Sequence, residues 1–226
     1  MVGADGIHST VRKLAVSASS SPHYAGTMVR RSIVDTRPPG IVDNIVIVMG
    51  DGAFFGVAPI GGGSTYGFGA VGGDQFEDPL VGRLERFRRR FAGFGGPIPA
   101  YRAGLRSDEP PHMGPIEWVE LDEWYPGRVV LIGDAAHAGP PHMTEGGCVA
   151  MEDGLVLAEV LRAEESVERA LEAYVRRRRP RTEWVQEQSR VAAQAWVPPS
   201  KVRDALFREA GDRMFRERVQ ALVSPP

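Results

Sequence analysis

The chain has 226 residues, of which 42% are hydrophobic and 25% are charged, and its formal net charge is -2. This composition is typical of a globular protein with one or two cores, and it excludes fibrous and disordered classes as well as a general nucleic-acid binder. The single cysteine excludes an internal disulfide, and no apolar run reaches the length of a membrane span. No charged and apolar leader precedes the first motif, so we expect a cytoplasmic protein.

The start of the chain predicts a strand end, an acidic turn and a short helix within residues 1–14. Ser9 or Thr10 is expected to cap the helix, because hydroxyl side chains accept hydrogen bonds from unpaired backbone N–H groups. Residues 17–21 then form a serine-rich connection.

Three residues near this turn are candidate ligand contacts. Asp5 and Gly6 lie in the sequence Gly-Ala-Asp-Gly, and Arg12 follows on the short helix. The alternative for Asp5 is a frayed chain end, because the strand before the turn is so short. Arg12 either meets a phosphate group or is a solvated helix residue.

The composition of the next part of the chain is typical of a β-sheet. Short segments rich in β-branched and aromatic residues are separated by Gly, Pro, Asp and Asn, which predicts antiparallel strands at 27–34, 45–49, 53–58 and 64–71. A helix is expected to begin at Pro79 and to run through residue 92, because apolar residues recur there at helical spacing. An outer strand is predicted at 116–121.

A dinucleotide-binding pattern, Gly-x-Gly-x-x-Gly, occurs at Gly67, Gly69 and Gly72. The pattern carries weight only between a buried strand and a helix, and here Asp74 and Phe76 follow instead of an apolar-periodic helix. We therefore interpret these glycines as part of a twisted antiparallel strand with close backbone packing.

The last third of the chain is predicted to be helical. We expect the arginine run 176–179 to be a solvated face and Pro180 to interrupt the helix. The helical pattern resumes at 182–196, and residues 200–223 predict one more amphipathic helix.

The most informative segment is 128–159, which predicts a buried strand, a sharp acidic turn and a helix that opens with glycines. Residues 129–132 form the continuous apolar run that is typical of a parallel strand covered on both faces. Gly133 and Asp134 follow at the carboxyl end of this strand, where ligands bind in open α/β sheets. A carboxylate at this place can accept hydrogen bonds from sugar or ribityl hydroxyls.

A helix with an open N-terminus is predicted next. Thr144 is expected to cap it, and its first turn holds Glu145, Gly146 and Gly147. Backbone N–H groups without blocking side chains would then face a ligand, and an electron-rich ring edge suits them.

Two other interpretations of this segment are weaker. A metal site at Asp134, His137 and His142 lacks any further cluster of ligands. Cys148 with His142 would form a nucleophile and a base, but a cysteine just inside a helix opening more often serves as buried packing.

Two motifs, GDAAHAGPPHMTEGGCVAMED at 133–153 and GADGIHSTVR at 3–12, resemble those of the FAD-dependent aromatic-ring monooxygenases, whose fold is typified by para-hydroxybenzoate hydroxylase. In that family the later motif holds the FAD ribityl chain with its aspartate, borders the isoalloxazine with a proline and points a glycine-opened helix at the flavin pyrimidine ring. The earlier motif contacts the diphosphate region and has been linked to nicotinamide cofactor binding. Many relatives carry glycine where this chain has Thr144. Cys148 resembles the zeaxanthin epoxidase and urate hydroxylase branches.

The resemblance implies a mixed α/β (α+β) fold with a partial FAD-binding Rossmann-like domain, an inserted antiparallel-sheet substrate domain and C-terminal helices. The implied domains are FAD-binding pieces at 1–25 and 123–165, a substrate domain at 26–122 and helices at 166–226. The implied FAD contacts are Asp5, Gly6, Arg12, Gly133, Asp134, Pro141, Glu145, Gly146, Gly147 and Cys148.

The reaction implied by the resemblance is hydroxylation of an aromatic or similarly electron-rich small molecule with NADH or NADPH and O2. The loop positions that hold a general base differ among relatives, so no base is assigned. The family's Gly-x-Gly-x-x-Gly segment stands before the point where this chain starts. The alternative is therefore a truncated noncatalytic remnant, or half of a split flavoenzyme, that acts as a ligand-binding or partner-binding module. A homodimer or a complementing N-terminal polypeptide is the partner expected in that case.

Overall fold

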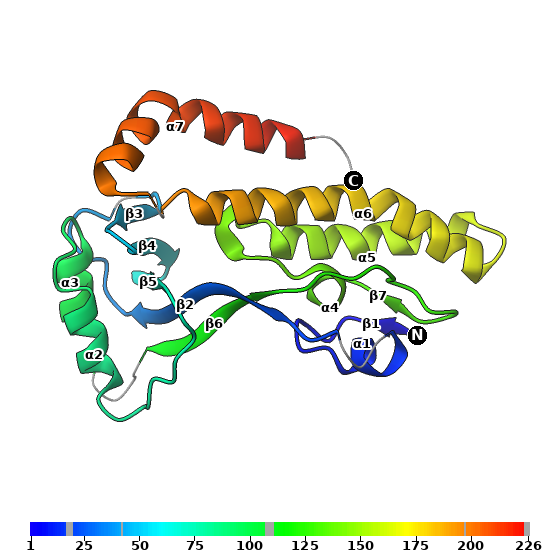
Figure 1. Cartoon of the computed structure of the whole chain (residues 1–226), viewed down its shortest axis with the longest axis horizontal. Coiled ribbons are helices and arrows are strands. Elements are labelled where there is room, and N and C mark those ends of the chain that lie inside the picture. The colour runs from blue at the N-terminus through cyan, green and yellow to red at the C-terminus, as the bar shows by residue number, and fades with distance from the viewer. Residues whose placement is uncertain (17–19, 42, 107–110, 197, 224–226) are drawn as a thin grey trace. The chain divides into compact units, whose positions relative to one another are not determined.

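The structure is a computed structural model, and it describes residues 1–16, 20–41, 43–106, 111–196 and 198–223. The chain divides into two compact units, of which unit 1 comprises 1–25, 117–195 and 205–226 and unit 2 comprises 26–116 and 196–204. Figure 1 shows the helices and strands with the labels used below. The combination of helices, a parallel strand pair and an antiparallel sheet confirms the predicted fold class. Residues 17–19 of the predicted serine-rich connection lie outside the described residues.

Unit 1 is built on a short parallel strand pair. Strand β1 (Val2–Gly3) pairs with β7 (Val130–Leu131), and Val2 lies opposite Val130. Helix α1 (Thr10–Ala15) follows the first strand and α4 (Asp134–His137) follows the second. The predicted parallel strand after residue 128 is therefore confirmed, although it is shorter than its apolar run.

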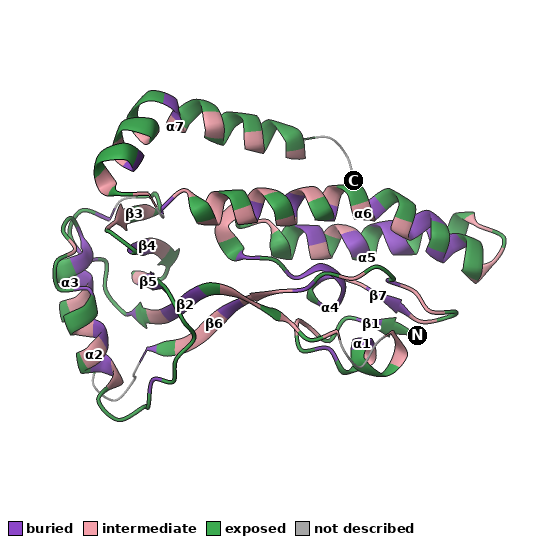
Figure 2. Cartoon of the chain, in the orientation of Figure 1, coloured by how far each residue is buried: buried purple, intermediate pink, exposed green. Residues whose placement is uncertain are grey.

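Two long helices form the core of unit 1 together with these strands. Helix α5 (Gly146–Ala163) buries the apolar residues Val149, Val156, Leu157 and Val160, which recur at helical spacing. Helix α6 (Val167–Gln194) begins at the cap residue Ser166, whose Oγ accepts a hydrogen bond from the Arg169 N–H at 3.2 Å. Figure 2 shows buried residues on both helices where they run side by side.

Two predictions about α6 are wrong. Pro180 lies inside a continuous helix, although a proline in a helix interior costs about 3 kcal/mol. Buried side chains on both sides of it, Tyr174 and Val185 among them, hold the helix in one piece. The arginine run is not a uniformly solvated face, because Arg178 is fully buried.

Unit 2 contains a five-stranded sheet in the order β3-β4-β5-β2-β6. The pairs β3–β4, β4–β5 and β5–β2 are antiparallel, as predicted. The strands are β2 (His23–Val34), β3 (Val46–Met49), β4 (Ala53–Gly61), β5 (Ser64–Gly72) and β6 (His112–Trp118). The outer strand β6 thus begins four residues earlier than its alternation predicted.

Helices α2 (Arg83–Arg90) and α3 (Ile98–Ala103) supply aromatic residues to the core of unit 2. The predicted start of the first helix at Pro79 is wrong, and the sequence analysis predicts no helix at 98–103. Gly67 and Gly69 lie in β5, where an added Cβ would meet the rings of Tyr101 and Phe91. The interpretation of these glycines as close strand packing is confirmed.

Two further elements complete the described chain. The 3₁₀ helix η1 (Pro141–Met143) precedes α5, and helix α7 (Ser200–Leu222) confirms the predicted last helix. Within the described ranges, none of the helices combines the length and the apolar character that a membrane crossing requires.

Candidate functional site

The acidic turn near the start of the chain is ordered around Asp5. Its carboxylate accepts hydrogen bonds from the Ser9 hydroxyl and from the backbone N–H groups of Thr10 at 2.7 Å and Val11 at 3.1 Å. Ser9 is the N-cap of α1, as predicted. The hydrogen bond from Ser9, followed by those from the backbone, lowers the pKa of Asp5 in spite of some desolvation. The frayed-end alternative is therefore wrong for this turn.

Arg12 joins this turn to the later motif. Its guanidinium is fully buried and donates to the carbonyl oxygens of Ile7, of Ser20 at 3.0 Å and of Ala135 at 2.9 Å. The solvated alternative for Arg12 is wrong. Through these hydrogen bonds Arg12 connects the acidic turn to Ala135 of α4.

Asp134 lies at the carboxyl end of β7, where the sequence placed it. Gly133 precedes it with φ 57°, a conformation that residues with a Cβ rarely adopt. An added Cβ at Gly133 would also approach Ala150 of α5 at 3.1 Å. The exposed Asp134 carboxylate has no hydrogen-bond partner among the described residues, so its acceptor oxygens are available to a ligand.

The N-terminus of α5 presents unpaired backbone N–H groups. The first helical hydrogen bond runs from the Val149 N–H to the Glu145 carbonyl at 2.9 Å, and the N–H groups of Gly146, Gly147 and Cys148 have no acceptor among the described residues. The predicted cap at Thr144 is wrong, because the N-cap is Glu145 and no side chain caps the helix. Thr144 instead has φ 60°, and no other described residue except glycine has a positive φ.

The two glycines in this first turn are not explained by the fold itself. Both have helical backbone, and an added Cβ on either would meet no atom within 4 Å. Glycine costs about 1 kcal/mol relative to alanine in a helix interior. The missing side chains therefore leave open space in front of the N–H groups, as close approach by a ligand requires.

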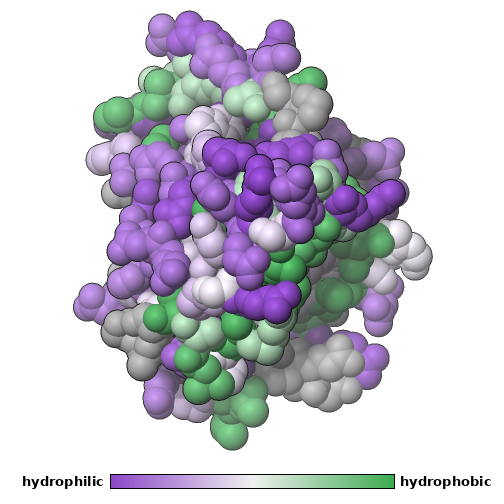
Figure 3. Space-filling view, turned by 90° about the vertical axis from the view of Figure 1, so that its right-hand side faces the viewer, coloured by the Kyte–Doolittle hydropathy of each residue, from purple (hydrophilic) through white to green (hydrophobic). Residues whose placement is uncertain are grey.

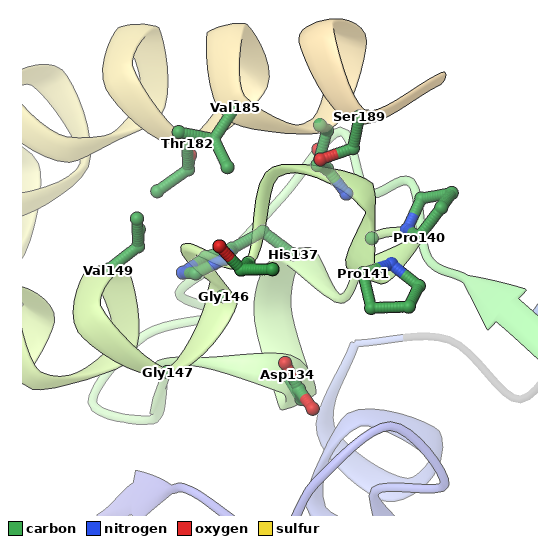
Figure 4. A pocket seen from close by; sticks show the side chains of 13 residues that line it. Asp134, His137, Pro140, Pro141, Gly146, Gly147, Val149, Thr182, Val185 and Ser189 are labelled. Atoms are coloured by element: carbon green, nitrogen blue, oxygen red, sulfur yellow. The ribbon is translucent and has the colours of Figure 1, made fainter. Parts of the chain in front are cut away.

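A cavity of about 250 Å³ adjoins this helix end (Figure 4). Asp134, Pro140, Pro141 and the two glycines line it from the motif, while Thr182, Val185 and Ser189 line it from α6. Of the predicted site residues, Asp134, Pro141, Gly146 and Gly147 are thus brought together around one cavity. The others do not line it, namely Asp5, Gly6, Arg12, Gly133, Glu145 and Cys148.

A charged cluster of His137, Asp153 and Arg178, which sequence reasoning missed, adjoins the cavity through His137. The Asp153 carboxylate accepts hydrogen bonds from the Gly133 N–H at 2.8 Å and from Arg178 Nε at 2.7 Å, and it lies 2.6 Å from His137 Nε2. Burial raises the pKa of Asp153, but the hydrogen bonds from His137, Arg178 and Gly133 outweigh it and leave the pKa below its ordinary value. The Glu-Asp pair that closes the motif was the available signal, but nothing in the sequence indicated its partner on α6.

The other candidate chemistries of this segment gain no support. No group of three or more metal-ligating side chains is found in the described part of the chain. Cys148 is exposed, so the expectation of buried packing is wrong. Burial lowers the pKa of His142.

Comparison with known proteins agrees with this geometry. Residues 116–189 match the family model described as FAD binding domain. The chain is 36% identical to "Aurachin C monooxygenase/isomerase" of Stigmatella aurantiaca over 77% of this chain and 45% of that protein. It is 32% identical to "3-amino-4-hydroxybenzoate 2-monooxygenase" of Streptomyces cremeus over 88% of this chain and 50% of that protein.

A solved structure covers the whole chain. It is that of Klebsiella pneumoniae HpxO complexed with FAD and uric acid, with a TM-score of 0.87, 26% identity and coverage of 100% of this chain and 60% of that one. Together the fold and the match to the FAD-binding family model define an FAD-binding class of protein. These matches support the family of FAD-dependent aromatic-ring monooxygenases for this chain, over the part of the relatives that it spans. It spans about half the length of the curated relatives it matches.

Proposed function

We propose that the chain binds FAD and takes part in the hydroxylation of an aromatic or similarly electron-rich small molecule, with NADH or NADPH and O2 as co-substrates. The observation that carries this proposal is the open first turn of α5, where Gly146 and Gly147 leave unpaired N–H groups facing free space beside the Asp134 carboxylate. The donor set fits FAD, because hydroxyls of a ribityl chain suit a carboxylate acceptor and an electron-rich ring edge suits N–H donors.

The proposed contacts divide by chemistry. Asp134 would hold ribityl hydroxyls, and the N–H groups of Gly146, Gly147 and Cys148 would meet the pyrimidine edge of the ring. Pro141 would border the ring as a rigid wall, and Gly133 and Glu145 would contribute backbone. Asp5 and Gly6 would serve the diphosphate region through the backbone of their turn, since the Asp5 carboxylate is already occupied by α1. The resemblance implies a direct contact for Arg12, whereas its hydrogen bonds within the protein favour the indirect role that we propose.

Electrostatics supports this arrangement. The chemistry that FAD supplies when bound is two-electron reduction by a nicotinamide and activation of O2 for transfer of one oxygen atom. The helix dipole at the N-terminus of α5 favours negative charge at the ring edge by about 0.3 to 2 kcal/mol. The backbone N–H groups are fixed by the helix before a ligand arrives, so they stabilise this charge without reorganisation.

The relatives support the substrate class. One relative is named for a 3-amino-4-hydroxybenzoate and the solved structure is a complex with uric acid, and both molecules are electron-rich rings. The match to a urate-binding structure also supports the branch that Cys148 indicated.

A partner polypeptide is part of the proposal. Unit 1 exposes several apolar side chains, namely Met1, Val2, Leu14, Met151 and Leu155. Figure 3 shows hydrophobic surface among hydrophilic surface on one side of the molecule. A second copy of the chain or a complementing N-terminal polypeptide would cover such residues, and light scattering with gel filtration would distinguish a dimer from a monomer.

The first experiment is a visible absorbance and fluorescence titration of the purified full chain with FAD. Saturable binding with quenched flavin fluorescence would support the proposal, and NAD(P)H oxidation with candidate phenols would follow. Failure to bind FAD would contradict the proposal for this chain and would favour either a noncatalytic remnant or half of a split enzyme. Adding a complementing polypeptide would distinguish these two alternatives, because only the split enzyme would then bind FAD.

A further inference from the structure

The cluster formed by His137, Asp153 and Arg178 ties together four elements of unit 1. Asp153 lies on α5, His137 on α4 and Arg178 on α6, while the Gly133 N–H belongs to the turn after β7. Arg178 also donates from Nη2 to the Val149 carbonyl at 3.1 Å. One buried carboxylate thus reaches the strand end on one side and, through Arg178, the first turn of α5 on the other.

Stability alone does not explain this cluster, because burying its charges has a large desolvation cost. Asp153 and Arg178 are both fully buried, and their desolvation offsets much of their mutual attraction. Well-packed apolar residues of similar volume often give equal or greater stability in such places. A role in fixing geometry therefore explains the cluster better than a role in stability.

The two points that the cluster fixes are the two ends of the proposed flavin site. Gly133 immediately precedes Asp134, so the hydrogen bond to Asp153 sets the backbone from which the free carboxylate projects. Val149 follows the three residues whose N–H groups are unpaired, so the bond from Arg178 sets the start of α5. Neither Asp153 nor Arg178 lines the cavity, and His137 alone of the three does.

We propose that Asp153 is a positioning residue that holds Asp134 and the open N-terminus of α5 in register for flavin binding. This inference rests on the proposed function for its ligand, but the positioning itself concerns the protein without a ligand. Asp153 acts through Gly133 and Arg178 and touches no ligand.

The test compares Asp153→Asn with Asp78→Asn in the full chain. Asp78 is a matched control because it is also buried and paired with arginines, Arg30 and Arg86, but lies in unit 2. An asparagine at 153 presents an amide N–H to one of the donors that now face the carboxylate, so one end of the cluster must open. Two readouts are measured, hydrogen exchange of the flavin-free protein and the FAD dissociation constant.

In Asp153→Asn we expect faster amide exchange at residues 130–138 or 144–150, and a tenfold or greater rise in the FAD dissociation constant. In Asp78→Asn we expect the dissociation constant to stay within twofold, with faster exchange confined to unit 2. Unchanged exchange in both segments of Asp153→Asn would overturn the inference. An equal loss of FAD affinity in both variants would overturn it too, because the loss would then be general.

A second variant covers the case in which Asp153→Asn does not fold. Arg178→Lys keeps a cation beside Asp153 but shortens the reach to the Val149 carbonyl, so exchange should rise at 144–150 and not at 130–138. Unchanged exchange at 144–150 would refute the inference. If the unmodified chain binds no FAD, the proposed function fails, whereas the exchange comparison still decides whether Asp153 positions these segments.

Discussion

Arg12 Nη1 donates a hydrogen bond to the carbonyl oxygen of Ala135 at 2.9 Å and so joins two segments that are 123 positions apart in the sequence. The same guanidinium binds the carbonyls of Ile7 and Ser20. Through this side chain the acidic turn at Asp5 and the turn at Asp134 become one structure. Two motifs that the sequence could only place in order are thereby brought together in unit 1.

Replacement of this residue should therefore destabilise unit 1. We expect Arg12→Met to lower the free energy of unfolding by about 3 kcal/mol, because it leaves buried carbonyl groups without donors. Urea unfolding followed by circular dichroism measures the change. Lys13→Met, at an exposed site on the same helix, should change it by less than about 0.5 kcal/mol. Equal effects of the two substitutions would contradict the buried role of Arg12.

The Asp153 cluster predicts a pH dependence of stability. The pKa of Asp153 is lower in the folded chain than the value of about 3.9 expected after unfolding. The carboxylate therefore stabilises the fold above that unfolded value, and the stabilisation disappears as the pH falls through the folded value. At pH 6 we expect the free energy of unfolding of the unmodified chain to be about 3 kcal/mol higher than that of Asp153→Asn, because breaking a buried ion pair leaves an uncompensated charge. Urea titrations should show the difference shrinking below about pH 4, and a difference that grows there would refute this explanation.

Replacement of Thr144 by glycine should increase the stability of the chain. Thr144 lies in the left-handed region, where a residue with a Cβ is strained by about 1 to 2 kcal/mol. Part of this strain is offset, because glycine loses more conformational entropy on folding. Thr144→Gly should therefore raise the free energy of unfolding by up to about 1 kcal/mol, measured as a higher urea midpoint. Thr144→Ser retains the Cβ and should show no gain. A loss of stability in Thr144→Gly would mean that the threonine side chain makes a contact worth more than the backbone strain.

Replacement of Gly67 by alanine should destabilise the core of unit 2. An added Cβ would overlap the Tyr101 ring, and overpacking of this kind costs about 1 to 3 kcal/mol. Gly67→Ala should lower the unfolding midpoint accordingly, while Gly93→Ala, which meets no atom within 4 Å, should not. Similar midpoints for the two variants would show that Tyr101 can move aside at little cost.

The sequence predicted the elements whose signals are local. The apolar run before Gly133, the segments rich in β-branched and aromatic residues in β2 to β5, and the glycines at 67 and 69 each point to one structure without help from distant residues. Boundaries were less accurate. Pro79 suggested a helix start, but α2 begins at Arg83, and Pro180 suggested a break that buried neighbours prevent.

The parts of the site that were missed depend on long-range pairing. Nothing local to Arg178 distinguishes it from its neighbours in the arginine run, and its burial follows from the carboxylate 25 positions away. The role of Arg12 likewise depends on Ala135, and no spacing rule connects them. The predicted cap at Thr144 is wrong for a related reason. A hydroxyl side chain before a glycine pair favours a helix cap, but the backbone of Thr144 adopts the left-handed conformation instead.

An FAD titration of Gly147→Ala beside Gly154→Ala tests whether the open first turn of α5 binds flavin. Both glycines lie in α5 and both have open space at Cβ, so alanine should not destabilise the helix at either position. We expect Gly147→Ala to raise the FAD dissociation constant tenfold or more, because the methyl group occupies the space in front of the N–H groups, and Gly154→Ala to leave it unchanged. Equal FAD affinity in Gly147→Ala and the unmodified chain would contradict the claim.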